Sequence, residues 1–116
     1  GLIVSNTTLD RPDTLGSAHA GEAGGLSGEP LKARARMALA AAVEASAGRL
    51  PLIAVGGISD GAEAYARIRA GASAIQLYSA LIFEGPDLIR RIKDDLAARL
   101  RADGFSTVAE AVGTAR

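Results

Sequence analysis

The chain has 116 residues, hydrophobic residues at 48% of its positions, and 13 basic and 13 acidic side chains that cancel at pH 7. This length and hydrophobic content predict one folded domain, and the zero net charge argues against a surface for nucleic acid or anionic membranes. Aromatic residues make up 3%, too few for base-stacking platforms, and the lack of cysteine excludes disulfides, thiolate metal sites and cysteine nucleophiles within these residues.

The first predicted strand is the short apolar run Leu2 to Val4, which is followed by four polar residues, Ser5 to Thr8. Polar side chains at the C-terminal end of a parallel strand lie where ligand sites form in α/β proteins. A turn held by the same side chains and by solvent explains them equally well. Because the chain begins inside this strand without a lead-in, we expect it to be the C-terminal piece of a longer protein.

Residues 9–28 form a long connection without a helical period, and loops of this length in compact domains are commonly lids or binding loops. The lone histidine, His19, has no partner at metal-ligand spacing and is expected to be a surface residue. The segment Gly24 to Gly28 places three glycines around Ser27, just before Pro30 begins a helix. This pattern favours an anion-binding nest with a helix dipole behind it, and a flexible hinge is the alternative.

A helix is predicted from Pro30 to Gly48, because its apolar residues keep helical spacing. Leu52 to Val55 then form a continuous apolar run, typical of a strand buried on both faces of a parallel sheet. The strand ends at Gly56 and Gly57, where backbone can approach a ligand closely. A strand, a glycine pair and a helix N-terminus together can present N–H groups to a phosphate. A βα loop that needs glycine only to turn is the simpler alternative.

Asp60 and Glu63 have the spacing of a capping box at the start of a helix that ends at Gly71. A third strand is predicted from Ala74 to Tyr78, followed by a short helical turn at Ser79 to Phe83. The last long helix is expected from Asp87, and a small terminal helix from Ser106. The apolar residues of the long helix predict a core stripe of Leu88, Ile89, Ile92, Leu96 and Leu100.

The predicted order of strands and helices alternates, which indicates βαβ units and parallel strands. The fold class is therefore α/β, and three βα units plus a terminal helix fit the last part of a (β/α)₈ barrel, which needs roughly 250 residues. An open doubly wound sheet is the alternative, although three strands would make it thin.

The strand ends closely resemble, in order and spacing, the C-terminal part of class 2 dihydroorotate dehydrogenase, the quinone-linked flavoenzyme family of pyrimidine synthesis. The resemblance covers essentially the whole chain. Its glycine motifs are shared with class 1 enzymes and other phosphate-binding barrels. The run from Tyr78 to Pro86 and the tail from Gly104 to Gly113 favour class 2. The matching strand ends are Ser5 to Thr8, Gly24 to Gly28, Gly56-Gly57, and Gln76 to Ser79.

The resemblance implies that residues 1–116 are the C-terminal portion of a single barrel domain with FMN at its C-terminal mouth. Asn6 and Thr7 match the pair that binds the ring of dihydroorotate or orotate. No metal ligands are implied. Ser5 and Ser79 stand where the family more often has Thr, and serine keeps the hydroxyl. The implied cofactor contacts are Ser5, Ser27, Gly28, Gly56, Gly57, Tyr78 and Ser79.

The family's catalytic serine base, an FMN-contacting lysine and the N-terminal helices that receive the quinone come from earlier in its chain. No residue here is therefore assigned as the catalytic base. The implied reaction is oxidation of dihydroorotate to orotate with FMN and a quinone, in a peripheral protein at the cytoplasmic face of the inner membrane. We expect no nucleic-acid partner, and we expect the isolated chain to be inactive and to self-associate. The alternatives are a class 1 enzyme, another FMN- or phosphate-binding barrel, and a flavin-binding half-barrel without turnover.

Overall fold

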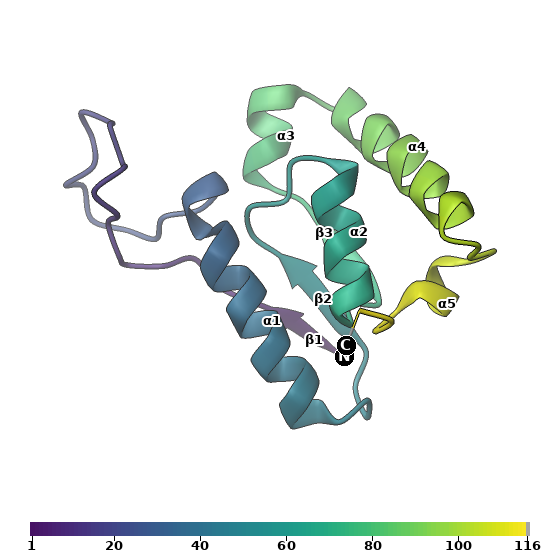
Figure 1. Cartoon of the computed structure of the whole chain (residues 1–116). Helices are drawn as coiled ribbons and strands as arrows, with labels where there is room; N and C mark the ends of the chain where they lie inside the picture. Colours follow the sequence, from purple (N-terminus) through teal and green to yellow (C-terminus); the bar gives the residue numbers. More distant parts are fainter. Residues whose placement is uncertain (116) are drawn as a thin grey trace.

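The computed structural model describes residues 1–115, which form a three-stranded parallel sheet with helices packed on it (Figure 1). The strands are β1 (Leu2–Val4), β2 (Leu52–Val55) and β3 (Ala74–Gln76), in the spatial order β1-β2-β3. Both neighbouring pairs are parallel, as predicted from the alternation of strands and helices. The third strand ends at Gln76, two residues earlier than expected.

The helices occupy the connections in the predicted order. Among the described residues, none is long and apolar enough to cross a membrane. The terminal helix begins later than expected because Thr107 is its N-cap, and the Thr107 hydroxyl accepts a hydrogen bond from the Glu110 N–H at 3.3 Å. The helical elements are η1 (Glu29–Leu31), α1 (Lys32–Ser46), α2 (Gly61–Ala70), α3 (Ser79–Glu84), α4 (Asp87–Ala102) and α5 (Val108–Ala111).

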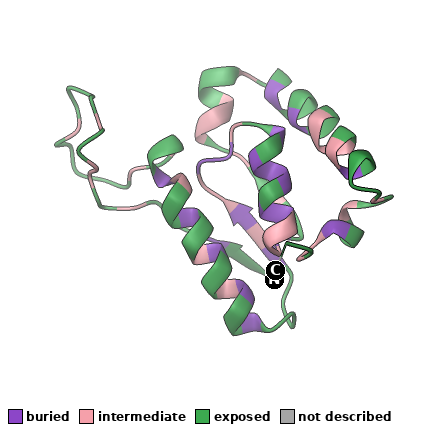
Figure 2. Cartoon of the chain, in the orientation of Figure 1, coloured by how far each residue is buried: buried purple, intermediate pink, exposed green. Residues whose placement is uncertain are grey.

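The core lies between the sheet and the helices α1, α2 and α4 (Figure 2). Helix α1 buries Leu39 and Val43 against Leu52 and Ala54 of β2, as its helical spacing predicts. On α4, burial of Leu88, Ile92 and Leu100 confirms three members of the predicted stripe. Including Ile89 in that stripe was wrong, since its side chain is 47% exposed. It follows Leu88 directly, so it lies about 100° further around the helix.

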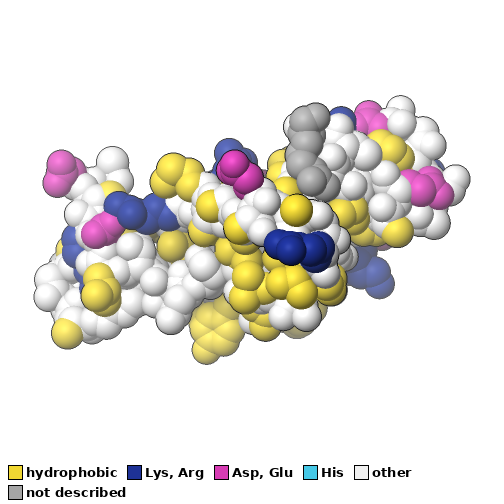
Figure 3. Space-filling model, turned by 90° about the horizontal axis from the view of Figure 1, so that it is seen from below, with side chains coloured by type: hydrophobic (Ala, Val, Ile, Leu, Met, Phe, Trp, Pro, Cys, Tyr) yellow, Lys and Arg dark blue, Asp and Glu magenta, His cyan; other side chains and the backbone are white. Residues whose placement is uncertain are grey.

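The other face of the sheet is not covered by helices of this chain. Leu2 and Ile3 of β1 are 47% and 52% exposed, and Ile53 and Val55 of β2 are only partly buried. Within this chain, the expectation that the strands are buried on both faces is therefore wrong. In a (β/α)₈ barrel this second face points to the packed interior, which other strands complete. Figure 3 shows hydrophobic side chains gathered near the middle of the molecule seen from below.

The segment between β1 and η1 extends away from the sheet and helices, and hydrogen bonds tie its two arms together (Figure 1). At its base, Thr8 and Leu26 exchange backbone hydrogen bonds of 3.1 and 2.7 Å. Farther out, the Arg11 guanidinium donates hydrogen bonds to the backbone carbonyls of Ala20, Glu22 and Gly24. His19 is exposed, as predicted, but it has a carboxylate partner, with Nδ1 2.7 Å from Glu22 Oε1.

Candidate functional site

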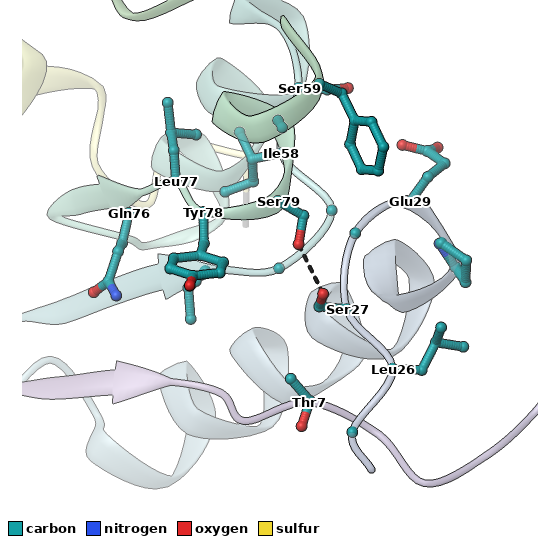
Figure 4. Close-up of a pocket in the computed structure, with 18 of the residues that line it drawn as sticks. Thr7, Leu26, Ser27, Glu29, Ile58, Ser59, Gln76, Leu77, Tyr78 and Ser79 are labelled. Atoms are coloured by element: carbon teal, nitrogen blue, oxygen red, sulfur yellow. Dashed lines mark hydrogen bonds between the residues drawn. The ribbon is translucent and has the colours of Figure 1, made fainter. Parts of the chain in front are cut away.

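An open cavity of about 650 Å³ lies at the C-terminal ends of β2 and β3 (Figure 4). Its walls come from residues 56–59 after β2, residues 76–80 around the end of β3, and residues 25–30 of the connection that leads into η1 and α1. Thr7, which follows β1, also lines the cavity, so residues after all three strands contribute to it. This is the sheet edge at which ligands bind in α/β proteins, and the volume is in the range of small-molecule sites.

Most of the predicted site residues meet at this cavity. Ser5 and Asn6 do not line it. Both are exposed beyond β1, and the Asn6 side-chain oxygen accepts a hydrogen bond from the Thr7 N–H at 2.8 Å. Their contacts with a flavin and a substrate ring stay predictions. The predicted residues that line the cavity are Thr7, Ser27, Gly28, Gly56, Gly57, Tyr78 and Ser79.

A pair of serine hydroxyls joins two of the cavity walls. Ser27 Oγ and Ser79 Oγ lie 2.7 Å apart and point toward each other, although they are 52 residues apart in the chain (Figure 4). Between Ser27 and η1, Gly28 has a φ of 78°, a conformation that favours glycine. Each hydroxyl can both donate and accept a hydrogen bond. One O–H is used in the bond between them, so the pair keeps one donor for an anion such as a phosphate.

The turn at Gly56 and Gly57 needs glycine for two physical reasons. Both residues have positive φ, 102° and 68°. In addition, a Cβ on Gly57 would lie 2.6 Å from Lys32 Cα, so the turn packs directly against the first residue of α1. The space that the missing side chain leaves is thus filled by this protein's own helix. Both reasons are structural, as the simpler interpretation expects, and the role of the pair in binding a ligand stays a prediction.

Gly57 also carries an unused hydrogen-bond donor. The residue is buried, and no acceptor within residues 1–115 receives its backbone N–H. Buried backbone N–H groups are nearly always paired in native proteins. Because Gly57 lines the cavity, an oxygen atom of a bound ligand is a suitable acceptor for this donor.

A buried ion cluster lies behind the glycine turn. Glu63 of α2 is 4% exposed and binds two arginines, Arg67 of the same helix and Arg36 of α1. Arg67 is 1% exposed, and its Nε lies 2.6 Å from Glu63 Oε1. Its Nη2 donates to the carbonyl oxygens of Gly56 and Lys32, each at 3.1 Å. One guanidinium therefore connects the glycine turn to the start of α1.

The charge state of Glu63 follows from these partners. Burial alone would raise the pKa of the Glu63 carboxyl, but hydrogen bonds from Arg36 and Arg67 outweigh it, and the pKa lies below its usual value. The predicted capping box is only half confirmed. Asp60 accepts a hydrogen bond from the Glu63 N–H at 2.7 Å, whereas the Glu63 side chain binds the arginines. A buried carboxylate is stabilised by charged partners, and this explains the difference.

Sequence patterns did not identify Arg67 as a functional residue, because an arginine in a helix usually lies on the solvent face. The available signal was its position four residues after Glu63, a spacing at which opposite charges meet on one helix face. The pairing of Arg36 of α1 with Glu63 across the helix interface was not predicted either.

The sequence family described as dihydroorotate dehydrogenase matches residues 1–100 of the chain. The chain belongs to this family. It is 68% identical over 113 residues to dihydroorotate dehydrogenase (quinone) of Rhodospirillum rubrum, and 60% identical over 113 residues to that of Azorhizobium caulinodans. Each comparison covers 97% of this chain, and 31% and 32% of the respective relative. The chain thus spans about a third of the length of these dihydroorotate dehydrogenases.

The fold agrees with part of a solved dihydroorotate dehydrogenase. The crystal structure of DHODH from Eimeria tenella in complex with ferulenol superposes with a TM-score of 0.94 at 45% identity. It covers 99% of this chain and 31% of that one. The three parallel strands are therefore a segment of the barrel of this enzyme, as predicted. The curated relatives are quinone enzymes, which confirms the resemblance to class 2 over class 1.

The family uses FMN, and the cavity fits the phosphate end of that molecule. The unpaired Gly57 N–H and the hydroxyls of Ser27 and Ser79 are hydrogen-bond donors on its walls. No carboxylate-, histidine- or cysteine-based metal cluster occurs within residues 1–115. The donors present suit the oxygens of a phosphate.

Proposed function

We propose that this chain supplies the phosphate end of the FMN site and part of the substrate site of a dihydroorotate dehydrogenase (quinone). That enzyme oxidises dihydroorotate to orotate in the synthesis of UMP. The observation that carries the proposal is the unpaired N–H of the buried residue Gly57, on a cavity that also gathers Ser27, Ser79 and Thr7. Membership in the quinone-linked family supports the choice of cofactor and substrate.

None of the described residues that line the cavity is Lys or Arg, so on this proposal neutral donors hold the phosphate. Gly57 donates its N–H, the bonded pair of Ser27 and Ser79 donates its one remaining hydroxyl hydrogen, and Gly28 gives the loop the turn that brings Ser27 to Ser79. The start of α1 lies against the Gly57 turn, so its N-terminal dipole favours an anion there. Ser5, Gly56 and Tyr78 are proposed as further flavin contacts, by their match to the family's motifs.

Asn6 and Thr7 are proposed to hold the substrate ring. An asparagine amide can donate and accept at once, which suits a ring with imide N–H and carbonyl groups. Bound FMN would supply the chemistry of hydride acceptance from dihydroorotate and electron delivery to the quinone. The residues of this chain orient the two rings and exclude water. The proton from dihydroorotate goes to a base outside these 116 residues, and the quinone site and peripheral membrane contact are proposed to lie there too.

The proposal is tested in the full-length protein that carries this segment. The purified protein should contain FMN by absorbance, and it should oxidise dihydroorotate when a quinone analogue is the acceptor. Protein that holds FMN but fails to oxidise dihydroorotate with any quinone would contradict the assignment of the reaction. Protein that folds and oxidises dihydroorotate without flavin would contradict the assignment of the cofactor.

Asn6→Ala in that full-length protein should impair dihydroorotate oxidation and leave the flavin content unchanged. Leaving polar groups of the enclosed substrate ring without their partner costs ~1–3 kcal/mol, which corresponds to a loss of roughly five- to 150-fold in kcat/KM. Steady-state kinetics and the ratio of flavin to protein absorbance give the two readouts. Asp13→Ala, an exposed change in the extended segment, is the matched control and should alter neither. Normal kinetics together with lost flavin would reassign Asn6 from substrate to cofactor.

A further inference from the structure

Arg67 occupies an unusual place for a charged side chain, since it is 1% exposed and lies behind the cavity wall. It is not among the residues that line the cavity. Its Nε binds Glu63, and its Nη2 donates to the backbone carbonyls of Gly56 and Lys32. Burying a charged guanidinium costs free energy of desolvation, so it needs fixed partners. Two of its partners are backbone carbonyls, one in the glycine turn and one at the start of α1. Arg67 therefore acts on the glycine turn from inside the protein.

The geometry of one peptide unit shows how this contact reaches the ligand. The Gly56 carbonyl and the Gly57 N–H belong to the same planar trans peptide, so they point in opposite directions. A hydrogen bond of 3.1 Å holds the carbonyl toward Arg67 in the interior. The Gly57 N–H must then point away from Arg67. This is the donor that has no acceptor within the described part of the chain, and its residue lines the cavity.

The Gly56–Gly57 peptide needs a partner that fixes its orientation. Peptides flanked by two glycines can rotate with little steric penalty, because neither residue has a Cβ. Without a fixed partner for its carbonyl, the Gly56–Gly57 peptide could turn its N–H away from the cavity. The second Arg67 bond, to the Lys32 carbonyl, ties the same guanidinium to the helix start against which Gly57 packs. The turn and the helix are thus held in one arrangement.

The cluster around Arg67 is built to keep the guanidinium in place. Glu63 is held at the start of α2 by the Asp60 N-cap, and it binds Arg67 and Arg36 at the same time. Glu63 thus holds Arg67 through an ion pair within its own helix and is itself held by Arg36 from α1.

We propose that Arg67 is a positioning residue for FMN, which fixes the Gly56–Gly57 peptide so that the Gly57 N–H donates to the cofactor's phosphate. This inference rests on the proposed function, since it names a residue that acts on the same phosphate site without touching the ligand. It predicts an effect on recognition of the phosphate group in particular. General loosening of the fold would instead weaken all flavins alike.

The test compares two flavins that differ in the phosphate. Apoprotein of the full-length enzyme is titrated with FMN and with riboflavin, and flavin fluorescence quenching gives both dissociation constants. In Arg67→Met the preference for FMN over riboflavin should fall about tenfold to a hundredfold, the worth of one hydrogen bond to a charged acceptor. Arg69→Met is the matched control. It removes an arginine of the same helix that pairs with Asp103 and contacts neither glycine.

A second variant keeps the test informative if Arg67→Met fails to fold. Glu63→Gln combined with Arg67→Met removes both buried charges together, so no unpaired ion remains in the core. It should show the same loss of FMN preference with a circular dichroism spectrum like that of the wild type. An FMN preference at the wild-type level in either folded variant would overturn the role of Arg67 while leaving the phosphate site standing. A wild-type protein that binds FMN and riboflavin equally would overturn the phosphate site and this inference together.

Discussion

Gly57→Val in the full-length protein is expected to empty the FMN site. A Cβ at this position would lie 2.6 Å from both Cα and Cβ of Lys32, and valine would have to adopt a φ of 68°. Overpacking costs ~1–3 kcal/mol, and a left-handed conformation adds ~1–2 kcal/mol for a residue with a side chain. The turn can relieve both costs only by moving away from α1. That movement displaces the Gly57 N–H from the cavity, so FMN affinity should fall by at least about tenfold.

Bound flavin is measured by absorbance after purification and by titration of the apoprotein. Gly104→Val is the matched control, because Gly104 follows α4 and has a similar φ of 81°, but a Cβ added to it would meet no atom within 4 Å. It should show a comparable conformational strain and keep its flavin. Full flavin occupancy in Gly57→Val would show that the contact with Lys32 does not control the site.

The second large effect concerns residues 1–116 expressed alone, which should not oxidise dihydroorotate and should self-associate. The chemistry should fail because the proposed base lies outside these residues. Self-association follows from the uncovered face of the sheet, where Leu2 and Ile3 are about half exposed, and from the open edges of β1 and β3. Ile82 and Phe83 of α3 are 71% and 86% exposed and add to the apolar surface.

Size-exclusion chromatography with light scattering measures the association, and dye reduction with dihydroorotate and added FMN measures the activity. The full-length protein, assayed under the same conditions, is the positive control. A monodisperse monomer that turns over dihydroorotate would contradict both expectations and would place a base within this chain.

Local sequence patterns predicted the strands and helices because each carries a short-range signal. The apolar run Leu52 to Val55, the N-cap at Asp60 and the spacing of Leu39 and Val43 on α1 are each decided by neighbours along the chain. The strand faces were predicted less well. An apolar strand indicates that both of its faces are covered in the native protein. It does not show whether the covering strands and helices belong to residues 1–116.

Long-range contacts explain what the sequence did not predict in the site. The glycines at 56 and 57 were recognised, with ligand approach and a plain turn left as alternatives, but the close contact of Gly57 with Lys32 was not predicted. The bond between Ser27 and Ser79 joins segments 52 residues apart, and the contact of Arg67 with the Gly56 carbonyl crosses 11 residues. Neither pairing leaves a periodic signal, so only the folded chain shows them.

The most direct test of the proposed site is a crystal structure of the full-length protein with FMN and orotate bound. We expect phosphate oxygens within hydrogen-bond distance of the Gly57 N–H and of the Ser27 and Ser79 hydroxyls, with the orotate ring against Asn6 and Thr7. The hydrogen bond between Arg67 and the Gly56 carbonyl should persist. A phosphate bound elsewhere, with the Gly57 N–H still unpaired in the complex, would contradict the assignment of this segment as the phosphate end of the flavin site.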